Sequence, residues 1–515
     1  MATANGQYDY VVIGAGAAGS IVAAEAANSG ASVLLIEMGG PVDPSNGKVW
    51  DPTRWYEVLA DPSFEIGFHS VPQKNLNMRT MPLLQSKGLG GCQIHNAMVY
   101  VRGGRSTYDY WSEALGCTGW SYAELETLFQ ENEARVTISR PSSTDAFSVN
   151  FRKTAERLGF PWNPDYNNGG SEFGSVPFQF TIDPQGPRRA TSFQALIGTG
   201  LPNLTILPHS RVNRLDLSQN PPGVEYQAIA GGDITTVYPQ REVILSAGAI
   251  ASPAILLRSG VGPADALQAL GIPVVMDLPM VGENFYDDLG VALPVVMPEV
   301  TMPEPYGYLG VGVFASSTGI NPGPNPGYGQ VDIEMQLSTT GLPGAPNPLA
   351  PGAACIIGTS SLHLKSRGTI SLASSDPAML PLVHPNWLSE EEDLNHVLAS
   401  VQLAYDFARD ADLAQAGGWA PFPDIPPLSG HLSQNLRYLA TQWIKATGIT
   451  VQHYVGSCSM GTDPTSSVVS PADLRVHGVP GLRVIDASVA PTPVTGNTAG
   501  VSMVIGAKGA ALLLA

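Results

Sequence analysis

One stretch near the start of the chain constrains the fold more than any other. Residues 8–13, YDYVVI, form a continuous apolar run, which is typical of a strand buried on both faces of a parallel sheet. The glycine-rich GAGAAG follows at 14–19. Gly14 allows the tight turn, Gly16 lets a phosphate approach the backbone, and Gly19 lets the next helix pack on the strand. This order predicts an α/β fold with a helix N-terminus directed at a pyrophosphate.

A second apolar run, SVLLIE at 32–37, predicts the next strand and ends in Glu37. A carboxylate about twenty residues after the glycines can accept a hydrogen bond from an adenosine ribose hydroxyl. Strand, glycines, helix, strand and acid in this order predict dinucleotide binding, and a glycine-rich turn without a ligand is the alternative. The motif leaves FAD or NAD open. Because no second GxGxxG follows, a flavoenzyme that NAD(P)H reduces at a second nucleotide unit is disfavoured.

The size and charge of the chain limit its partners. A length of 515 residues exceeds the roughly 250–300 that one core usually holds, so two domains are expected. The formal net charge of −18 repels a phosphate backbone, so we expect no nucleic-acid partner. No apolar run reaches the roughly 18 residues of a membrane-spanning helix. The first basic residue is Lys48, which disfavours a signal peptide, so we expect a cytoplasmic protein.

Metal chemistry has no support in the sequence. The nine histidines show no HExxH pattern, and the four cysteines form no CxxC pair. The cysteines lie far apart, at Cys92, Cys117, Cys355 and Cys458. We therefore expect neither a metal site nor a disulfide framework.

Further motifs follow the first one in a fixed order. They are GLGGCQIHN at 88–96, GAIASPAILLRSGVGP at 248–263, VGENFYDD at 281–288 and GLRVIDASVAP at 481–491. The apolar stretch REVILSA, just before the second motif, predicts a strand that runs into Gly248. The motif itself predicts a helix that begins near Ser252-Pro253. The last predicts a strand that delivers Asp486 to the C-terminal edge of the sheet, where ligands bind; an ordinary helix cap is the alternative. Together these motifs resemble the glucose-methanol-choline (GMC) oxidoreductase family.

The resemblance runs nearly end to end and implies a division of the chain. A Rossmann-like FAD-binding domain would take residues 1–145, 186–289 and 451–515. An α+β substrate domain with a mostly antiparallel sheet would take 146–185 and 290–450, where stretches such as QVDIEMQL and SRGTISLAS predict strands. The segment around Val212, which on its own predicts only a strand, would pack near the adenine.

The same resemblance gives a role to the histidine of the glycine-rich stretch. In the family this signature, here with Gly91 and Asn96, runs along the flavin. Members similar to choline oxidases place a histidine just before the asparagine, where it bonds covalently to the flavin C8 methyl group. His95 occupies that position. Noncovalent FAD with His95 nearby is the alternative, and Gln93-Ile94 departs from the serines that are more usual.

An alcohol that loses a proton and then a hydride needs a base of near-neutral pKa and a polar group for the alkoxide. The resemblance assigns these roles to His453 and Asn497, although an asparagine before an apolar helix is also a plain cap signal. It places Val451 near the flavin carbon where oxygen reacts, and Trp55 in the substrate pocket. At position 288 the family pattern has histidine, and this chain has Asp288.

The resemblance therefore implies an FAD-dependent alcohol oxidase that gives an aldehyde and hydrogen peroxide. The carboxylate that choline-oxidising members place shortly after the Asp-His pair is missing, since the matching position is about Gly290. We therefore expect an uncharged primary alcohol as substrate, with oxygen as acceptor and a homodimer as one possible assembly. A dehydrogenase with a quinone or protein acceptor is the alternative. A hydroxynitrile lyase is disfavoured because its His-His site differs at Asn497.

Overall fold

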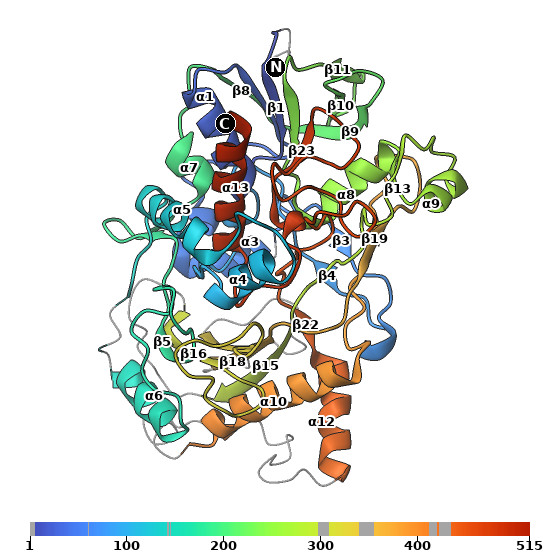
Figure 1. The fold of residues 1–515 in the computed structure, drawn as a ribbon. Helices are drawn as coiled ribbons and strands as arrows, with labels where there is room; N and C mark the ends of the chain where they lie inside the picture. The colour runs from blue at the N-terminus through green and yellow to red at the C-terminus, as the bar shows by residue number, and fades with distance from the viewer. Residues whose placement is uncertain are drawn as a thin grey trace.

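A computed structural model describes residues 6–59, 61–141, 144, 146–296, 308–338, 355–410, 420–421 and 434–515. Two sheets organise the molecule. In Figure 1 the strands of a parallel sheet lie in the upper half, and those of a larger antiparallel sheet lie in the lower half above helices α10 and α12. Both chain ends lie in the upper half. The mixed α/β fold with a second, sheet-rich part is as expected from the sequence.

The five-stranded sheet is parallel throughout and has the order β23-β12-β1-β2-β8. Its strands are β1 Tyr10–Ile13, β2 Val33–Ile36, β8 Leu204–Leu207, β12 Glu242–Leu245 and β23 Leu482–Val484. All four residues of β1 and of β2 are buried, as the continuous apolar runs predict for strands covered on both faces. The C-terminal edge of this sheet borders the cavity described below.

Three helices begin at or near that edge. They are α1 Ala17–Asn28, α8 Gly248–Arg258 and α13 Ala499–Leu514. Helix α13, which is red in Figure 1, packs against α1, the blue helix beside it. The approach is close because a Cβ atom at Gly506 would lie 2.7 Å from the Cα atom of Ala18. The glycine thus lets the two helices touch through backbone.

The start of α8 corrects the sequence interpretation. The helix begins at Gly248, four residues before the predicted start near Ser252-Pro253. Pro253 lies inside the helix, where it cannot donate to the carbonyl of Ala249. The hydroxyl of Ser457 donates to that carbonyl instead, at 2.5 Å. A side chain that is distant in the sequence thus supplies the missing donor, which no local pattern could predict.

The second sheet has seven strands, in the order β21-β15-β18-β17-β16-β5 with β22 also paired to β15. Its pairings are antiparallel. The strands are β5 Gly174–Pro177, β15 Leu289–Val296, β16 Tyr308–Ala315, β17 Ile333–Ser338, β18 Cys355–Ser361, β21 Ala420–Pro421 and β22 Ile449–Thr450. Helices α6 Ala146–Arg157, α10 Glu391–Ala408 and α12 Gln434–Thr447 accompany this sheet.

One predicted strand of the second sheet lies elsewhere. QVDIEMQL contributes β17, but SRGTISLAS forms β19 Thr369–Ser371, which pairs only with β20 Leu382–His384 in a separate two-stranded sheet. Both stretches alternate polar and apolar residues, and alternation does not specify which partner a strand pairs with. The division of the chain at the proposed domain boundaries stays a prediction.

The remaining elements are short or lie at the periphery. Three strands, β9 Ser210–Asp216, β10 Gly223–Ala228 and β11 Thr235–Val237, form an antiparallel sheet. The other strands pair as β3 Phe68–His69 with β4 Pro82–Leu83, β6 Ile182–Asp183 with β7 Arg188–Arg189, and β13 Val261–Gly262 with β14 Met276–Asp277. The other helices are α2 Gly47–Trp50, α3 Trp55–Leu59, α4 Arg105–Glu113, α5 Tyr122–Arg135, α7 Ser192–Leu196 and α9 Ala264–Ala269, with one-turn helices at Pro52–Arg54, Lys74–Leu76, Gly91–Ile94 and Ala487–Val489.

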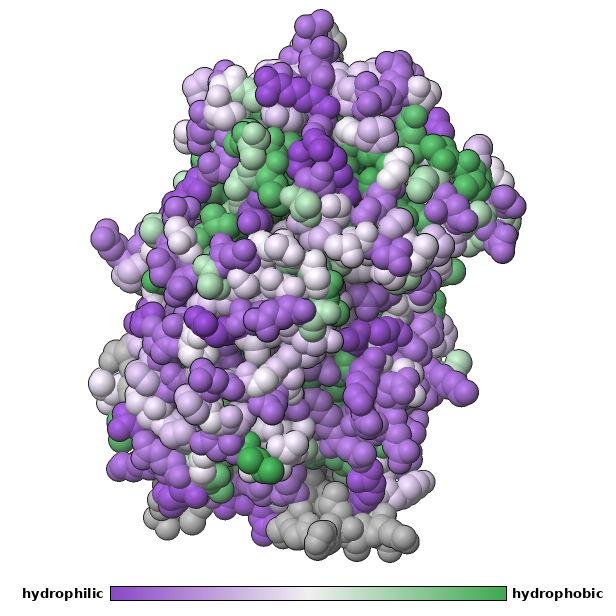
Figure 2. All heavy atoms as spheres, in the orientation of Figure 1, coloured by the Kyte–Doolittle hydropathy of each residue, from purple (hydrophilic) through white to green (hydrophobic). Residues whose placement is uncertain are grey.

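The face of the molecule in Figure 2 is mostly hydrophilic, with apolar side chains in separate patches. Exposed apolar residues include Ile229 and Ile234 in the β10–β11 connection and Val275 between α9 and β14. Among the described helices, none combines the length and the apolar character that crossing a bilayer requires.

Candidate active site

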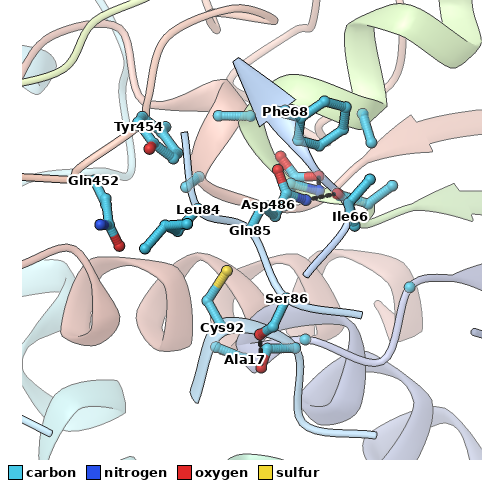
Figure 3. A pocket seen from close by; sticks show the side chains of 18 of the residues that line it. Ala17, Ile66, Phe68, Leu84, Gln85, Ser86, Cys92, Gln452, Tyr454 and Asp486 are labelled. Atoms are coloured by element: carbon cyan, nitrogen blue, oxygen red, sulfur yellow. Dashed lines mark hydrogen bonds between the residues drawn. The ribbon is translucent and has the colours of Figure 1, made fainter. Parts of the chain in front are cut away.

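A large cavity lies between the two sheets. Its lining comes from the C-terminal edge of the parallel sheet, from Gln336 on β17 and from Ile449 and Thr450 on β22. Figure 3 looks into it, with Asp486, Gln85 and Cys92 among the labelled side chains. The cavity brings together nearly all the residues that the sequence singled out: Gly14, Gly16, Glu37, Trp55, Gly91, His95, Asn96, Val212, Val451, His453, Asp486 and Asn497.

Glycines allow two loops to meet at one end of the cavity. A Cβ atom at Gly91 would lie 2.6 Å from the Cα atom of Gly16, and Gly91 has a positive φ of 54°. The amide of Gly90 donates to the carbonyl of Ala15 at 2.9 Å, which fastens the loops together. Gly19 does not line the cavity. A side chain there would collide with the carbonyl of Gly14, so Gly19 serves the packing of helix on strand, as expected.

Glu37 holds three loops at once. One carboxylate oxygen accepts from the amide of Ala15 at 2.9 Å, and the other accepts from Gly39 at 2.8 Å and Gly88 at 2.9 Å. The side chain is buried, and this burial raises its pKa from the ordinary value while the amide hydrogen bonds oppose the rise. The glycine-rich loop after β1 and the stretch before Gly91 are therefore tied to the end of β2. A ribose contact of Glu37 stays a prediction.

Asp486 makes the corresponding connection on the other side of the sheet. Its Oδ2 accepts from the amide of Gly248 at 2.9 Å and from the hydroxyl of Ser252 at 2.6 Å. Its Oδ1 accepts from the amide of Ser488 at 2.8 Å, so Asp486 also caps the one-turn helix that follows. Asp486 therefore lines the cavity and also acts as a helix cap, and its contact with the cofactor stays a prediction. The carboxylate links the loop after β23 to the first turn of α8.

The predicted attachment residue, His95, is held by an acid that the sequence interpretation missed. Its Nδ1 lies 2.7 Å from Oε1 of Glu65, and the two side chains are only 3% and 10% exposed. Burial lowers the pKa of His95, but Cys92 and Glu65 raise it more, to about 9. Since Nδ1 is engaged by Glu65, Nε2 is the nitrogen available to the cavity. Glu65 is paired to Ser86 across a β-bridge, which fixes its backbone.

The signature loop itself is held by a buried arginine. Arg189 donates from Nη1 to the side-chain oxygen of Asn96 at 2.7 Å and to the carbonyls of Gln93 and Asn96 at 2.9 and 2.7 Å. Gln93, one of the departures from the family pattern, is buried and accepts from the amide of Ser192 at 2.8 Å. The departure therefore contributes to packing. Gln93 and Asn96 lie in the signature, but Arg189 itself carried no sequence signal.

His453 and Asn497 lie side by side. Asn497 Nδ2 is 3.0 Å from His453 Nε2, and Gln336 Nε2 lies 3.5 Å from Asn497 Oδ1. The cap of α13 is Thr498, so Asn497 lies one residue before it and its side chain is directed to His453, not to the helix amides. This corrects the interpretation of Asn497 as the helix cap.

The other ring nitrogen of His453 contacts Asp288. The distance from Nδ1 to Asp288 Oδ2 is 2.7 Å, and both side chains are buried. Burial lowers the pKa of His453, but the hydrogen bond and charge of Asp288 raise it further, so the net shift is upward from 6.5. The neighbouring Asp287 accepts from the amide of His453 at 2.9 Å and from the hydroxyl of Thr450 at 2.5 Å.

The backbone before His453 turns sharply. Val451 and His453 both line the cavity, and Gln452 between them has a positive φ of 66°. His453 thus lies in a loop directly after β22, consistent with the strand or loop edge expected from the sequence. Trp55 on α3 is buried and reaches the same cavity, and Val212 on β9 lines it together with Arg211 and Arg258.

Among the described residues that line the cavity, the acids are Glu37 and Asp486, and both accept hydrogen bonds from backbone amides of the glycine-rich loops. Many of the other described lining residues are uncharged. These include Trp55, Leu59, Met98, Val99, Gln336, Pro377, Met379, Leu380, Pro381 and Val451. The described residues gather no group of three or more histidines, cysteines and acids that could hold a metal ion.

Sequence profiles of GMC oxidoreductases match residues 8–289 and 365–506. The chain belongs to the GMC oxidoreductase family. As a GMC oxidoreductase it binds FAD, and its cavity fits this cofactor. The N-termini of α1, α8 and α13 all line the cavity, so their partial positive charges can stabilise the anionic pyrophosphate and flavin. A Cβ atom at Gly16 would meet no protein atom within 4 Å, so this glycine leaves open space in the lining.

Curated relatives and solved structures match nearly the whole chain. The chain is 31% identical to the oxygen-dependent choline dehydrogenase of Yersinia pseudotuberculosis, over 98% of this chain and 93% of that protein. It is 26% identical to the pyridoxine 4-oxidase of Mesorbium loti, with a TM-score of 0.85 over 98% and 99% of the two chains. The fold is also that of an Aspergillus oryzae formate oxidase, at 22% identity and a TM-score of 0.86 over 99% of both chains.

Proposed function

We propose that this GMC oxidoreductase oxidises an uncharged primary alcohol to the aldehyde, with dioxygen as the final electron acceptor. The observation that carries the proposal is the arrangement at His453, whose Nε2 lies in the cavity beside Asn497 while Nδ1 is held by Asp288. FAD, when bound, would supply the hydride acceptor, and dioxygen would then take up the electron pair as hydrogen peroxide. The protein must supply the base, the orientation of the alcohol and the exclusion of water.

His453 acts as the general base. Gln336 donates to Asn497 Oδ1, so Asn497 presents its Nδ2–H to His453 Nε2, which therefore accepts. Nδ1–H then donates to Asp288, and the unprotonated Nε2 can take the hydroxyl proton of the alcohol. When the alcohol is bound, Asn497 can donate to the developing alkoxide. A base of this kind contributes roughly 10²–10⁴-fold to the rate.

An uncharged alcohol suits the lining around His453 best. A quaternary ammonium group that loses its hydration needs a counter-charge, and unpaired charges are costly in an apolar site. Among the described cavity residues, the acids Glu37 and Asp486 are already engaged by the glycine-rich loops. The relatives of this chain include choline dehydrogenases. Choline-oxidising members of the family have an acid at about the position of Gly290, and this chain lacks it. We therefore place choline outside the preferred substrates.

Two further features belong to the proposal. Val451 borders the cavity next to His453 and leaves room for oxygen at the flavin; an organic or protein electron acceptor is the alternative. His95, with Nδ1 on Glu65, attaches FAD covalently through Nε2. A homodimer and a cytoplasmic location stay predictions from the sequence.

The experiment is anaerobic mixing of the FAD-loaded protein with a neutral primary alcohol, followed by admission of oxygen. Flavin absorbance should be lost on mixing and should recover with oxygen, with one peroxide formed per flavin. His453→Ala should retain FAD but lose absorbance at least about 100-fold more slowly, since the base is gone. Loss of absorbance without recovery in oxygen would contradict the oxidase assignment, and equal rates in His453→Ala would contradict the base.

A further inference from the structure

The proposed base, His453, contacts two buried acids that are consecutive in the sequence. Asp287 accepts from the backbone amide of His453 at 2.9 Å, and Asp288 lies 2.7 Å from its ring Nδ1. Both side chains come from the VGENFYDD stretch, 165 positions away from His453 in the case of Asp288. One acid thus fixes where the histidine backbone lies, and the other fixes how its ring is turned.

We propose that Asp288 is a positioning residue that holds His453 in the tautomer with Nε2 unprotonated and stabilises the imidazolium after proton transfer. This inference rests on the proposed function, since it assigns a task to the partner of the proposed base. It assigns no contact with the alcohol to Asp288. The group acts through His453 alone.

The hydrogen bonds of Asp288 leave it little freedom. Oδ2 accepts from His453, and Oδ1 accepts from the hydroxyl of Tyr286. That hydroxyl itself accepts from the backbone amide of Leu364 at 3.1 Å. Both carboxylate oxygens are therefore engaged, and the side chain is 1% exposed. A carboxylate held in this way cannot rotate without breaking a hydrogen bond in a site closed to water.

The tautomer follows from the partners on both sides of the ring. An ionised carboxylate only accepts, so Nδ1 must carry the proton. On the other side Asn497 donates its Nδ2–H to Nε2, because its Oδ1 is taken by Gln336 Nε2. Neutral imidazole has one donor and one acceptor nitrogen, and this arrangement makes Nε2 the acceptor. Nε2 is thus the nitrogen that can remove a proton.

The negative charge distinguishes this chain from the pattern it resembles. The family motif VGxNLxDH has histidine at the position of Asp288. A second imidazole there could accept the Nδ1 proton but would bring no fixed negative charge. With Asp288 the proton that His453 takes from the alcohol creates an ion pair in a buried site, which favours the transfer.

Other titratable groups also face His453. Burial raises the pKa of Asp287 to about 7, against the hydrogen bond from Thr450. Burial likewise raises the pKa of Glu334 to about 7; this acid accepts from Gln336 Nε2 at 2.5 Å. Neither contacts the ring of His453 through a described hydrogen bond. The charges of Asp287 and Glu334 also raise the pKa of His453, and substitution of Asp288 leaves this effect in place.

The test is the pH dependence of kcat/KM for a neutral alcohol in Asp288→Asn. The base must be neutral to act, so activity rises as pH passes the pKa of His453. Removing the anion lowers that pKa, so the rising limb should move to lower pH by about one unit or more. The plateau should also fall, by no more than the roughly 10²–10⁴-fold a general base contributes, because an amide can also stabilise the wrong tautomer.

Asp393→Asn is the matched control, since Asp393 is also buried and accepts hydrogen bonds from the amides of Lys365 and Ser366 away from the cavity. It should leave the limb in place. FAD content and thermal midpoint of both variants check folding, and Asp288→Glu, which keeps the charge, should return the limb toward its original position. A fall in activity with an unmoved limb would overturn the proposal. If wild type itself oxidises no alcohol, the proposed function fails instead.

Discussion

Buried acids organise the cavity residue by residue. Glu37 and Asp486 hold the backbone of the cofactor loops, Glu65 holds the ring of His95, and Asp288 holds the ring of His453. Each carboxylate accepts hydrogen bonds from groups of the protein, and these hydrogen bonds stabilise its negative charge. The excess of acidic residues in the composition thus says nothing about the charge that a substrate meets.

His95 carries the most direct prediction at this scale. When the FAD-loaded protein is denatured in acid and precipitated, the proposed bond from Nε2 of His95 predicts that the flavin remains with the polypeptide. His95→Ala removes the only attacking nitrogen and should release its FAD into the supernatant. His69→Ala, an exposed histidine of the same region, should retain it. Complete release of FAD from the wild-type protein would contradict covalent attachment.

Single residues were predictable from sequence where a motif stands in a continuous stretch. Gly16, Gly91 and Asp486 line the cavity. They could be predicted because each stands in a motif whose residues are adjacent in the sequence. The partners of the two histidines were not predictable in this way. Glu65 lies 30 positions from His95, and Asp288 lies 165 positions from His453, so only the folded chain brings them together.

At the level of elements, three helix N-termini meet at the cavity, and their positions depend on backbone contacts. Helix α13 packs against α1, and Asn497, just before its first turn, lies 3.0 Å from His453. Apolar patterns in the sequence predicted both helices. They did not predict that α8 begins at Gly248, since its interior proline is tolerated through Ser457, a residue some two hundred positions away.

Gly506→Ala tests the contact between α1 and α13. The added Cβ would lie 2.7 Å from Ala18 Cα, so the helices must separate and the cavity must open. We expect a loss of roughly 1–3 kcal/mol in unfolding free energy, as for overpacked cores, together with weaker FAD retention. Ala511→Ser, an exposed change on the same helix, should alter neither. Unchanged stability and FAD content in Gly506→Ala, measured by thermal unfolding and absorbance, would contradict this account.

At the scale of the whole molecule, the site exists only because two sheets enclose it. The parallel sheet supplies the cofactor loops, and β17 and β22 of the antiparallel sheet border the region around His453. Four strands of the first sheet, β1, β2, β12 and β23, were predictable because each is an apolar run that leads into a turn, whereas β8 was not predicted. For the second sheet, the sequence predicted only that a mostly antiparallel sheet forms. Alternating polar and apolar residues do not specify which strands pair, and β19 pairs outside this sheet.

The central claim is that an uncharged alcohol, not a cation, delivers its proton to His453 and its hydride to FAD. The most direct measurement compares choline with 3,3-dimethylbutan-1-ol, which has the same shape without the charge, as reductants of the bound flavin under anaerobic stopped flow. We predict that the neutral alcohol reduces the flavin with a second-order rate constant at least about tenfold higher, since about 1.4 kcal/mol of uncompensated charge suffices for that ratio. Faster reduction by choline, or no reduction by either alcohol, would contradict the account.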